Sequence, residues 1–158
     1  MLRVAGFALA LPLAAAMAAS LSPRLAWAGG SSAVIQLRGI VPQDCSVSVQ
    51  DRGVVFELGA AAQSRSVAAI EERCNAPAGY TVTLSSRNGG ELRPEGGAGA
   101  GLPYVMTYDD ATPAGAGRVV AARPPGTETK DLYVETRPAD GLRAGSYDDT
   151  IVVTVEAK

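Results

Sequence analysis

Residues 33–41 decide how the fold is interpreted, and they run Ala33-Val34-Ile35-Gln36-Leu37-Arg38-Gly39-Ile40-Val41. A period of two is typical of a half-buried β-strand, because successive side chains of a strand point to opposite faces. One face of this stretch consists of Ala33, Ile35, Leu37, Gly39 and Val41. The sequence therefore predicts strand character ahead of the first cysteine.

The residues before this stretch resemble a secretory signal peptide in their organisation. Arg3 precedes a long apolar run from Phe7 through Leu21, and the small-residue site Ala26-Trp27-Ala28 precedes Gly29-Gly30. Pro12 and Pro23 interrupt the apolar run, which is shorter than the roughly 20 residues of a bilayer span. The sequence predicts export with cleavage after Ala28, so residues 1–28 form the signal peptide and the mature chain has no membrane span.

The charge of the mature chain argues against nucleic acid as a partner. Without Arg3 and Arg24, the 14 basic residues become 12 against 16 acidic ones, a formal charge of −4. Phosphate binding needs clustered lysines and arginines, whereas this chain has only Lys130 and Lys158 beside scattered arginines. The remaining residues suit one domain, predicted to cover residues 44–158.

Two cysteines, Cys45 and Cys74, occur in a chain that is predicted to be exported. An even pair in an oxidising compartment predicts a disulfide. A metal pair is the alternative, but two sulfur ligands in a chain without histidine leave a zinc site short of ligands.

Period-two patterns continue along the rest of the mature chain and predict an all-β domain, most plausibly a β-sandwich. Ser64–Glu72 also fits a helical period, and the Gly-rich stretch Gly89–Gly101 is predicted to be a flexible exposed loop without cofactor. The predicted strands are Cys45–Gln50 with Val54–Leu58, Arg65–Arg73, Gly79–Ser86, Leu102–Asp109, Arg118–Ala122, Asp131–Thr136 and Tyr147–Glu156.

A catalytic site is not indicated. The chain has no histidine, which is the commonest general base, and the serines have no neighbouring base. Asp109-Asp110 and Asp148-Asp149 are adjacent acids that would point to opposite faces of a strand. Asp110 and Asp148 could act as calcium ligands in turns, but solvated acids at strand ends are the simpler interpretation. We expect neither an enzyme nor a resident metal or cofactor.

Several motifs resemble the spore coat protein U group and the related archaic chaperone–usher pilus subunits. The segment 34–41 running into Asp44-Cys45-Ser46-Val47 is similar to the N-terminal extension of pilus subunits. Glu72-Arg73-Cys74-Asn75 followed by 79–85 is similar to that group's passage from cysteine to strand. Residues 102–109 look like its middle strand and 142–155 like its closing strand. The resemblance covers nearly the whole mature chain.

This resemblance implies an incomplete immunoglobulin-like β-sandwich whose missing strand is supplied by another molecule. Residues 29–43 would be the donor-strand extension, with Ala33, Ile35, Leu37 and Val41 inserted and Gly39 at a tight position. The closing strand ends close to Lys158, as an incomplete sandwich predicts, and Ile151, Val153 and Val155 would contact a chaperone. The tail Glu156-Ala157-Lys158 departs from the family, whose members often end on an apolar or aromatic residue.

The function implied is that of a secreted subunit of a surface pilus, fimbria or coat, assembled by donor-strand exchange and supporting adhesion or biofilm formation. Implied partners are copies of itself or related subunits, a periplasmic chaperone and an outer-membrane usher. The chain would pass through the periplasm to an extracellular fibre on the cell surface. Two alternatives remain open, namely a domain complemented in cis by residues 33–41 and a binding or adhesin module that does not polymerise.

Overall fold

The computed structural model describes residues 30–158 except residues 60, 98 and 110. Residues 30–39 belong to a unit separate from residues 40–158. The described chain is all-β, as predicted, and its strands are antiparallel. The strands are β1 (Cys45–Asp51), β2 (Gln63–Cys74), β3 (Tyr80–Ser86), β4 (Glu91–Pro94), β5 (Leu102–Tyr108), β6 (Thr112–Pro113), β7 (Arg118–Arg123), β8 (Gly126–Thr136), β9 (Tyr147–Asp148) and β10 (Ile151–Ala157).

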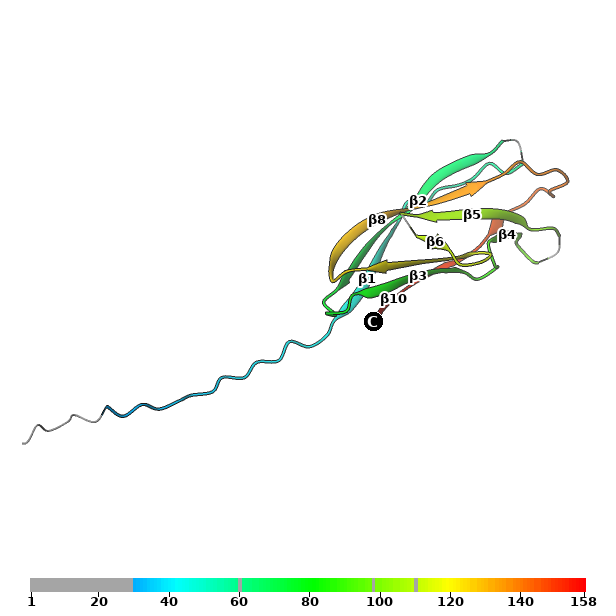
Figure 1. Cartoon of the computed structure of the whole chain (residues 1–158). Coiled ribbons are helices and arrows are strands. Elements are labelled where there is room, and N and C mark those ends of the chain that lie inside the picture. Colours follow the sequence, from blue (N-terminus) through cyan, green and yellow to red (C-terminus); the bar gives the residue numbers. More distant parts are fainter. Residues whose placement is uncertain (1–29, 60, 98, 110) are drawn as a thin grey trace, which may run out of the picture. The chain divides into compact units, whose positions relative to one another are not determined.

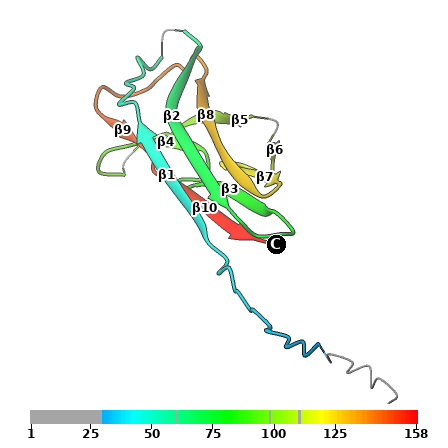
Figure 2. The same cartoon turned by 90° about the vertical axis from the view of Figure 1, so that its left-hand side faces the viewer.

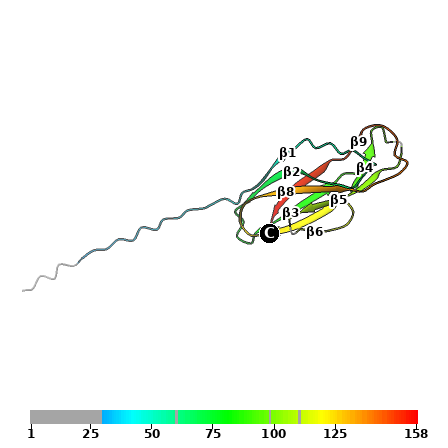
Figure 3. The same cartoon turned by 90° about the horizontal axis from the view of Figure 1, so that it is seen from above.

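The strands form two sheets (Figure 1). One has six strands in the order β1-β2-β8-β5-β4-β9, and the other has four in the order β10-β3-β7-β6. β1 pairs with β2 so that Cys45 lies opposite Cys74, and these two residues form the predicted disulfide. Figure 3 shows β4 and β9 at the end of the domain away from the C-terminal residue.

Both sheets contribute to one hydrophobic core. In β5 the burial alternates strictly, because every second side chain points to the core. Ile70 of β2 and Leu132 of β8 come from the six-stranded sheet, and Val82 and Leu84 of β3 come from the other. The side chains of Ile70, Val82 and Leu84 are fully buried.

A charged cluster is buried at the edge of this core. The Glu72 carboxylate is fully buried, and it accepts hydrogen bonds from the Tyr108 hydroxyl and from Arg123 Nε at 3.3 Å. Arg123 Nη2 lies 3.2 Å from Asp109 Oδ2, which Lys130 Nζ contacts at 3.1 Å. Burial lowers the pKa of Arg123, but the nearby carboxylates of Glu72 and Asp109 outweigh this and raise it. The cluster therefore compensates the cost of burying a charge.

Most predicted strands are confirmed. The segment 64–72, which also fitted a helix, lies within β2. The strands predicted at Gly79–Ser86, Leu102–Asp109, Arg118–Ala122 and Asp131–Thr136 correspond to β3, β5, β7 and the second half of β8.

The strand predicted at Val54–Leu58 is wrong. β1 ends at Asp51, whose carboxylate Oδ1 accepts a hydrogen bond from the Gly53 amide at 2.8 Å. Gly53 has φ +61, a left-handed conformation that glycine adopts without steric cost. The chain therefore turns out of the sheet before the apolar run begins.

Two further predictions need correction. The Gly89–Gly101 stretch is not all loop, because β4 occupies Glu91–Pro94 and pairs with β5 and β9. The single strand predicted at Tyr147–Glu156 is interrupted at 149–150, so that β9 joins the six-stranded sheet and β10 the four-stranded one. The break has a physical cause in the hydrogen bonds of Asp149, described below.

Residues 30–44 form no strand. Their large apolar side chains are exposed, with Val34 at 88%, Ile35 at 84% and Leu37 at 91%. The predicted signal peptide and its cleavage site lie outside the described residues. No helix in the part of the chain that the structure describes is long and apolar enough to cross a bilayer.

Candidate functional site

Among the described residues, the end strands are β1 and β9 in one sheet and β10 and β6 in the other, and each pairs with another strand on one side only. β1 and β10 lie near each other but form no ladder, as Figure 2 shows. Unpaired strands present rows of free N–H and C=O groups, which are a template for pairing with another strand.

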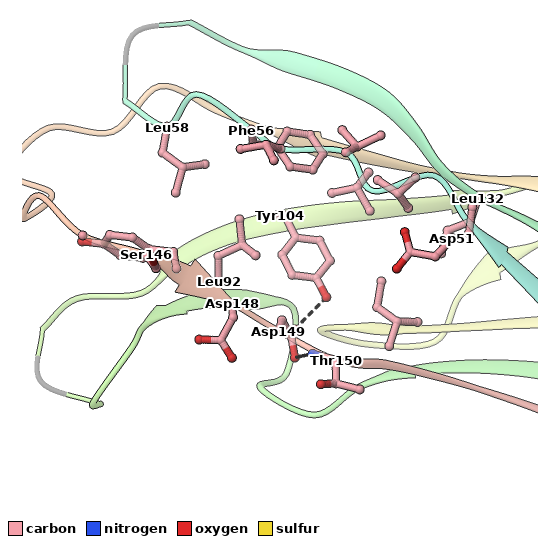
Figure 4. A pocket seen from close by; sticks show the side chains of 18 of the residues that line it. Asp51, Phe56, Leu58, Leu92, Tyr104, Leu132, Ser146, Asp148, Asp149 and Thr150 are labelled. Carbon is pink, nitrogen blue, oxygen red and sulfur yellow. Dashed lines mark hydrogen bonds between the residues drawn. The ribbon is translucent and has the colours of Figure 1, made fainter.

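A groove with a cavity volume of about 1020 Å³ opens beside these edges. Its lining comes from β1, the 54–58 segment, the strands β2, β8 and β5, Leu92 of β4, and the 142–153 segment. Figure 4 shows Phe56 and Leu58 on one side of the groove, and Leu92 beside Asp148 and Asp149 on the other. The groove thus gives access to apolar side chains that belong to the core.

Core-facing residues beside the groove are incompletely covered. Val49 of β1 lies opposite the fully buried Ile70, yet it is 50% exposed. Ile151 and Val153 of β10 pack against the core and are only half-buried. Apolar side chains on the core face of a strand are normally covered, so the groove has room for additional apolar groups.

Asp149 organises one end of the groove. Its Oδ2 accepts hydrogen bonds from the Tyr104 hydroxyl at 2.7 Å and the Ser86 hydroxyl at 2.5 Å. Its Oδ1 accepts the Asn88 amide at 3.1 Å and the Thr150 amide at 2.6 Å. Burial raises the pKa of Tyr104, and the hydrogen bond to Asp149 raises it further. These bonds fix the point at which the chain passes from β9 to β10.

The electrostatic character of the groove is acidic. Asp51, Asp148 and Asp149 line it together with a single basic residue, Arg143. Asp51 lies on the core-facing side of β1, opposite Ala68. A ligand for this groove would combine apolar side chains with a backbone able to pair with β1 or β10, and a positive charge would be favoured at its rim.

The residues predicted for the site lie on β10 and in the N-terminal segment 33–41. Ile151, Val153 and Val155 lie on the core-facing side of β10, alternating with the exposed Val152, Thr154 and Glu156. Ile151 and Val153 line the groove. The role of these residues toward a chaperone stays a prediction. So does the donor role of Ala33, Ile35, Leu37, Gly39 and Val41.

Sequence reasoning missed several groove residues. Phe56 and Leu58 were predicted to belong to a strand, but they lie outside the strands and their side chains line the groove. The sequence placed Tyr104 in a strand and Asp149 in an adjacent acid pair at a strand end, and it did not reveal their contact, which spans 45 residues. Asp110, considered as a calcium ligand, lies outside the described residues. Asp148 is exposed, and the described part of the chain holds no group of three or more histidine, cysteine or acidic residues placed to hold a metal ion.

A scan of protein-family models finds no match to this chain, and a search of curated proteins finds no relative.

Proposed function

We propose that this protein is an exported structural subunit of a surface fibre, and that its groove receives an apolar β-strand from a second copy of the chain. The domain would then be an immunoglobulin-like β-sandwich that lacks one strand. The observation that carries the proposal is the apolar groove between two unpaired sheet edges, lined by half-covered core residues.

The strand that fits this groove best is residues 33–41. Nine extended residues span about 30 Å, enough to follow the whole of the seven-residue β10. Ile35, Leu37 and Val41 would fill the groove, and burying each would contribute about 1.5–3 kcal/mol. Residues 29–43 have one charged side chain, Arg38, which would lie on the face opposite the inserted one and so avoid burial in the groove.

Insertion from one copy into the next is a head-to-tail contact, which propagates as a filament. Assembly would draw on unfinished folding energy and would need no nucleotide. Before assembly, a periplasmic chaperone would cover the free edge of β10, where Ile151, Val153 and Val155 lie, and an outer-membrane usher would export the fibre. Adhesion or biofilm formation is the purpose that the resemblance to pilus subunits suggests.

The test is the state of the mature chain after secretion into an oxidising periplasm. We expect multimers that survive SDS at room temperature and dissociate on boiling. Leu37→Asp, which places a charge on the inserted face, should abolish them, whereas Gln36→Asp on the opposite face should leave them. A wild-type chain that is entirely monomeric, or equal behaviour of the two variants, would refute assembly through this segment.

A further inference from the structure

Asn75, the residue after β2, holds the chain that leads into β1. The Asn75 amide donates to the Asp44 carbonyl at 3.1 Å, and the Asp44 amide donates to Asn75 Oδ1 at 2.7 Å. Asn75 Nδ2 donates to the Pro42 carbonyl at 2.9 Å. The side-chain amide therefore acts like a further peptide group beyond the end of the strand.

These bonds continue the β1–β2 ladder. Cys45 lies opposite Cys74, so the next position of the same register places Asp44 opposite Asn75. The Cys45–Cys74 disulfide joins the two strands at the adjacent position. Residues 42–44 are thereby kept alongside Asn75, in line with β1.

The direction of residues 42–44 bears on which groove the N-terminal extension can reach. β1 runs from Cys45 toward the groove, which it lines with Val49 and Asp51, and the chain that precedes Cys45 leaves in the opposite direction. Residues 33–41 could lie beside β1 of the same molecule only if the chain reversed between Val41 and Cys45. Such a turn would break the bonds from Asn75 to Pro42 and Asp44. Pro42 also restrains Val41 to an extended conformation, which opposes the turn.

We propose that Asn75 is a positioning residue that keeps the extension out of the groove of its own domain and so leaves that groove for a second copy of the chain. This inference rests on the proposed function, because it presupposes that the groove accepts residues 33–41. The Asn75 side chain would thus favour insertion in trans over insertion in cis.

The test uses monomers of the full mature chain, purified at low concentration, and a fluorescent synthetic peptide of residues 29–43. The measured quantity is the fraction of monomers that forms an SDS-resistant complex with the peptide. We expect wild-type monomers to take up the peptide. Asn75→Ala monomers should take up about tenfold less, because losing two hydrogen bonds allows their own extension to compete. Arg73→Ala, an exposed neighbour on β2, is the matched control and should behave as wild type.

The double variant Leu37→Asp/Asn75→Ala separates competition from damage to the fold. Its extension cannot fill the groove, so uptake should return to the level of Leu37→Asp alone. Unchanged uptake by Asn75→Ala would overturn the proposal, and so would a loss that Leu37→Asp does not restore, since that pattern indicates a merely structural role. If Leu37→Asp with Asn75 intact takes up no peptide, the groove does not accept this strand, and the proposed function fails together with this inference.

Discussion

Replacing Asp149 by alanine should destabilise the domain and open the end of the groove. The carboxylate accepts four hydrogen bonds, two of them from the partly buried hydroxyls of Tyr104 and Ser86. A hydrogen bond to a charged group contributes about 1.5–3 kcal/mol, and the bond from the Thr150 amide is exposed to solvent. We therefore expect Asp149→Ala to lower the free energy of unfolding by about 3 kcal/mol. Asp148→Ala is the matched control, because the Asp148 side chain is exposed, and it should change stability by less than about 0.5 kcal/mol.

The assay is urea unfolding followed by far-UV circular dichroism on the monomeric mature chain. With a slope of about 2 kcal/mol/M, the expected loss moves the unfolding midpoint by about 1.5 M. The same variant should take up the 29–43 peptide less well, because the start of β10 is no longer fixed. If the midpoints of Asp149→Ala and Asp148→Ala agree, the assignment of Asp149 as the residue that separates β9 from β10 is wrong.

Three further perturbations test the account of the fold. Glu72→Ala should cost about 3–5 kcal/mol, because it leaves the Arg123 guanidinium buried without this partner, whereas Glu71→Ala on the exposed face should be nearly neutral in the same urea assay. Burial and the Glu72 carboxylate raise the pKa of Tyr80 from 10.0 to about 12, so the unfolded chain loses this proton first and stability should fall between about pH 10 and 12; Tyr80→Phe should make that decline shallower in unfolding curves recorded across the range. Replacing both cysteines by serine should cost about 3–4 kcal/mol, since the disulfide closes a loop with a sequence separation of 29, and a loss below about 1 kcal/mol would contradict this.

Strands whose side chains alternate between buried and exposed can be predicted from the sequence. Features that depend on contacts between residues far apart in the chain cannot. Burial alternates strictly in β5 and over Tyr80–Ser85 of β3, so periodicity finds both strands. The break between β9 and β10 depends on Ser86 and Tyr104, which are far away in the sequence, and no local pattern marks it. The apolar residues 54–58 show a strand pattern, but the turn at Gly53 removes them from the sheet.

Some features of the candidate site could likewise be predicted from the sequence, and others could not. The disulfide followed from cysteine count and the predicted compartment, and the structure confirms it. The apolar face of residues 33–41 is visible in the sequence. The groove that would receive it is formed by residues of both sheets, which only the folded chain brings together. Burial of Glu72 was also unpredictable, because Arg123, which neutralises it, lies 51 residues further along the chain.

The central claim is that the free edges of β1 and β10 accept residues 33–41 of another molecule. Hydrogen exchange of the Leu37→Asp chain, recorded with and without a saturating 29–43 peptide, tests it most directly. The account predicts that amides of β1 and β10 that exchange quickly alone become protected in the complex, while the central strands β2 and β8 change little. Exchange in β1 and β10 that the peptide leaves unaltered would contradict the claim.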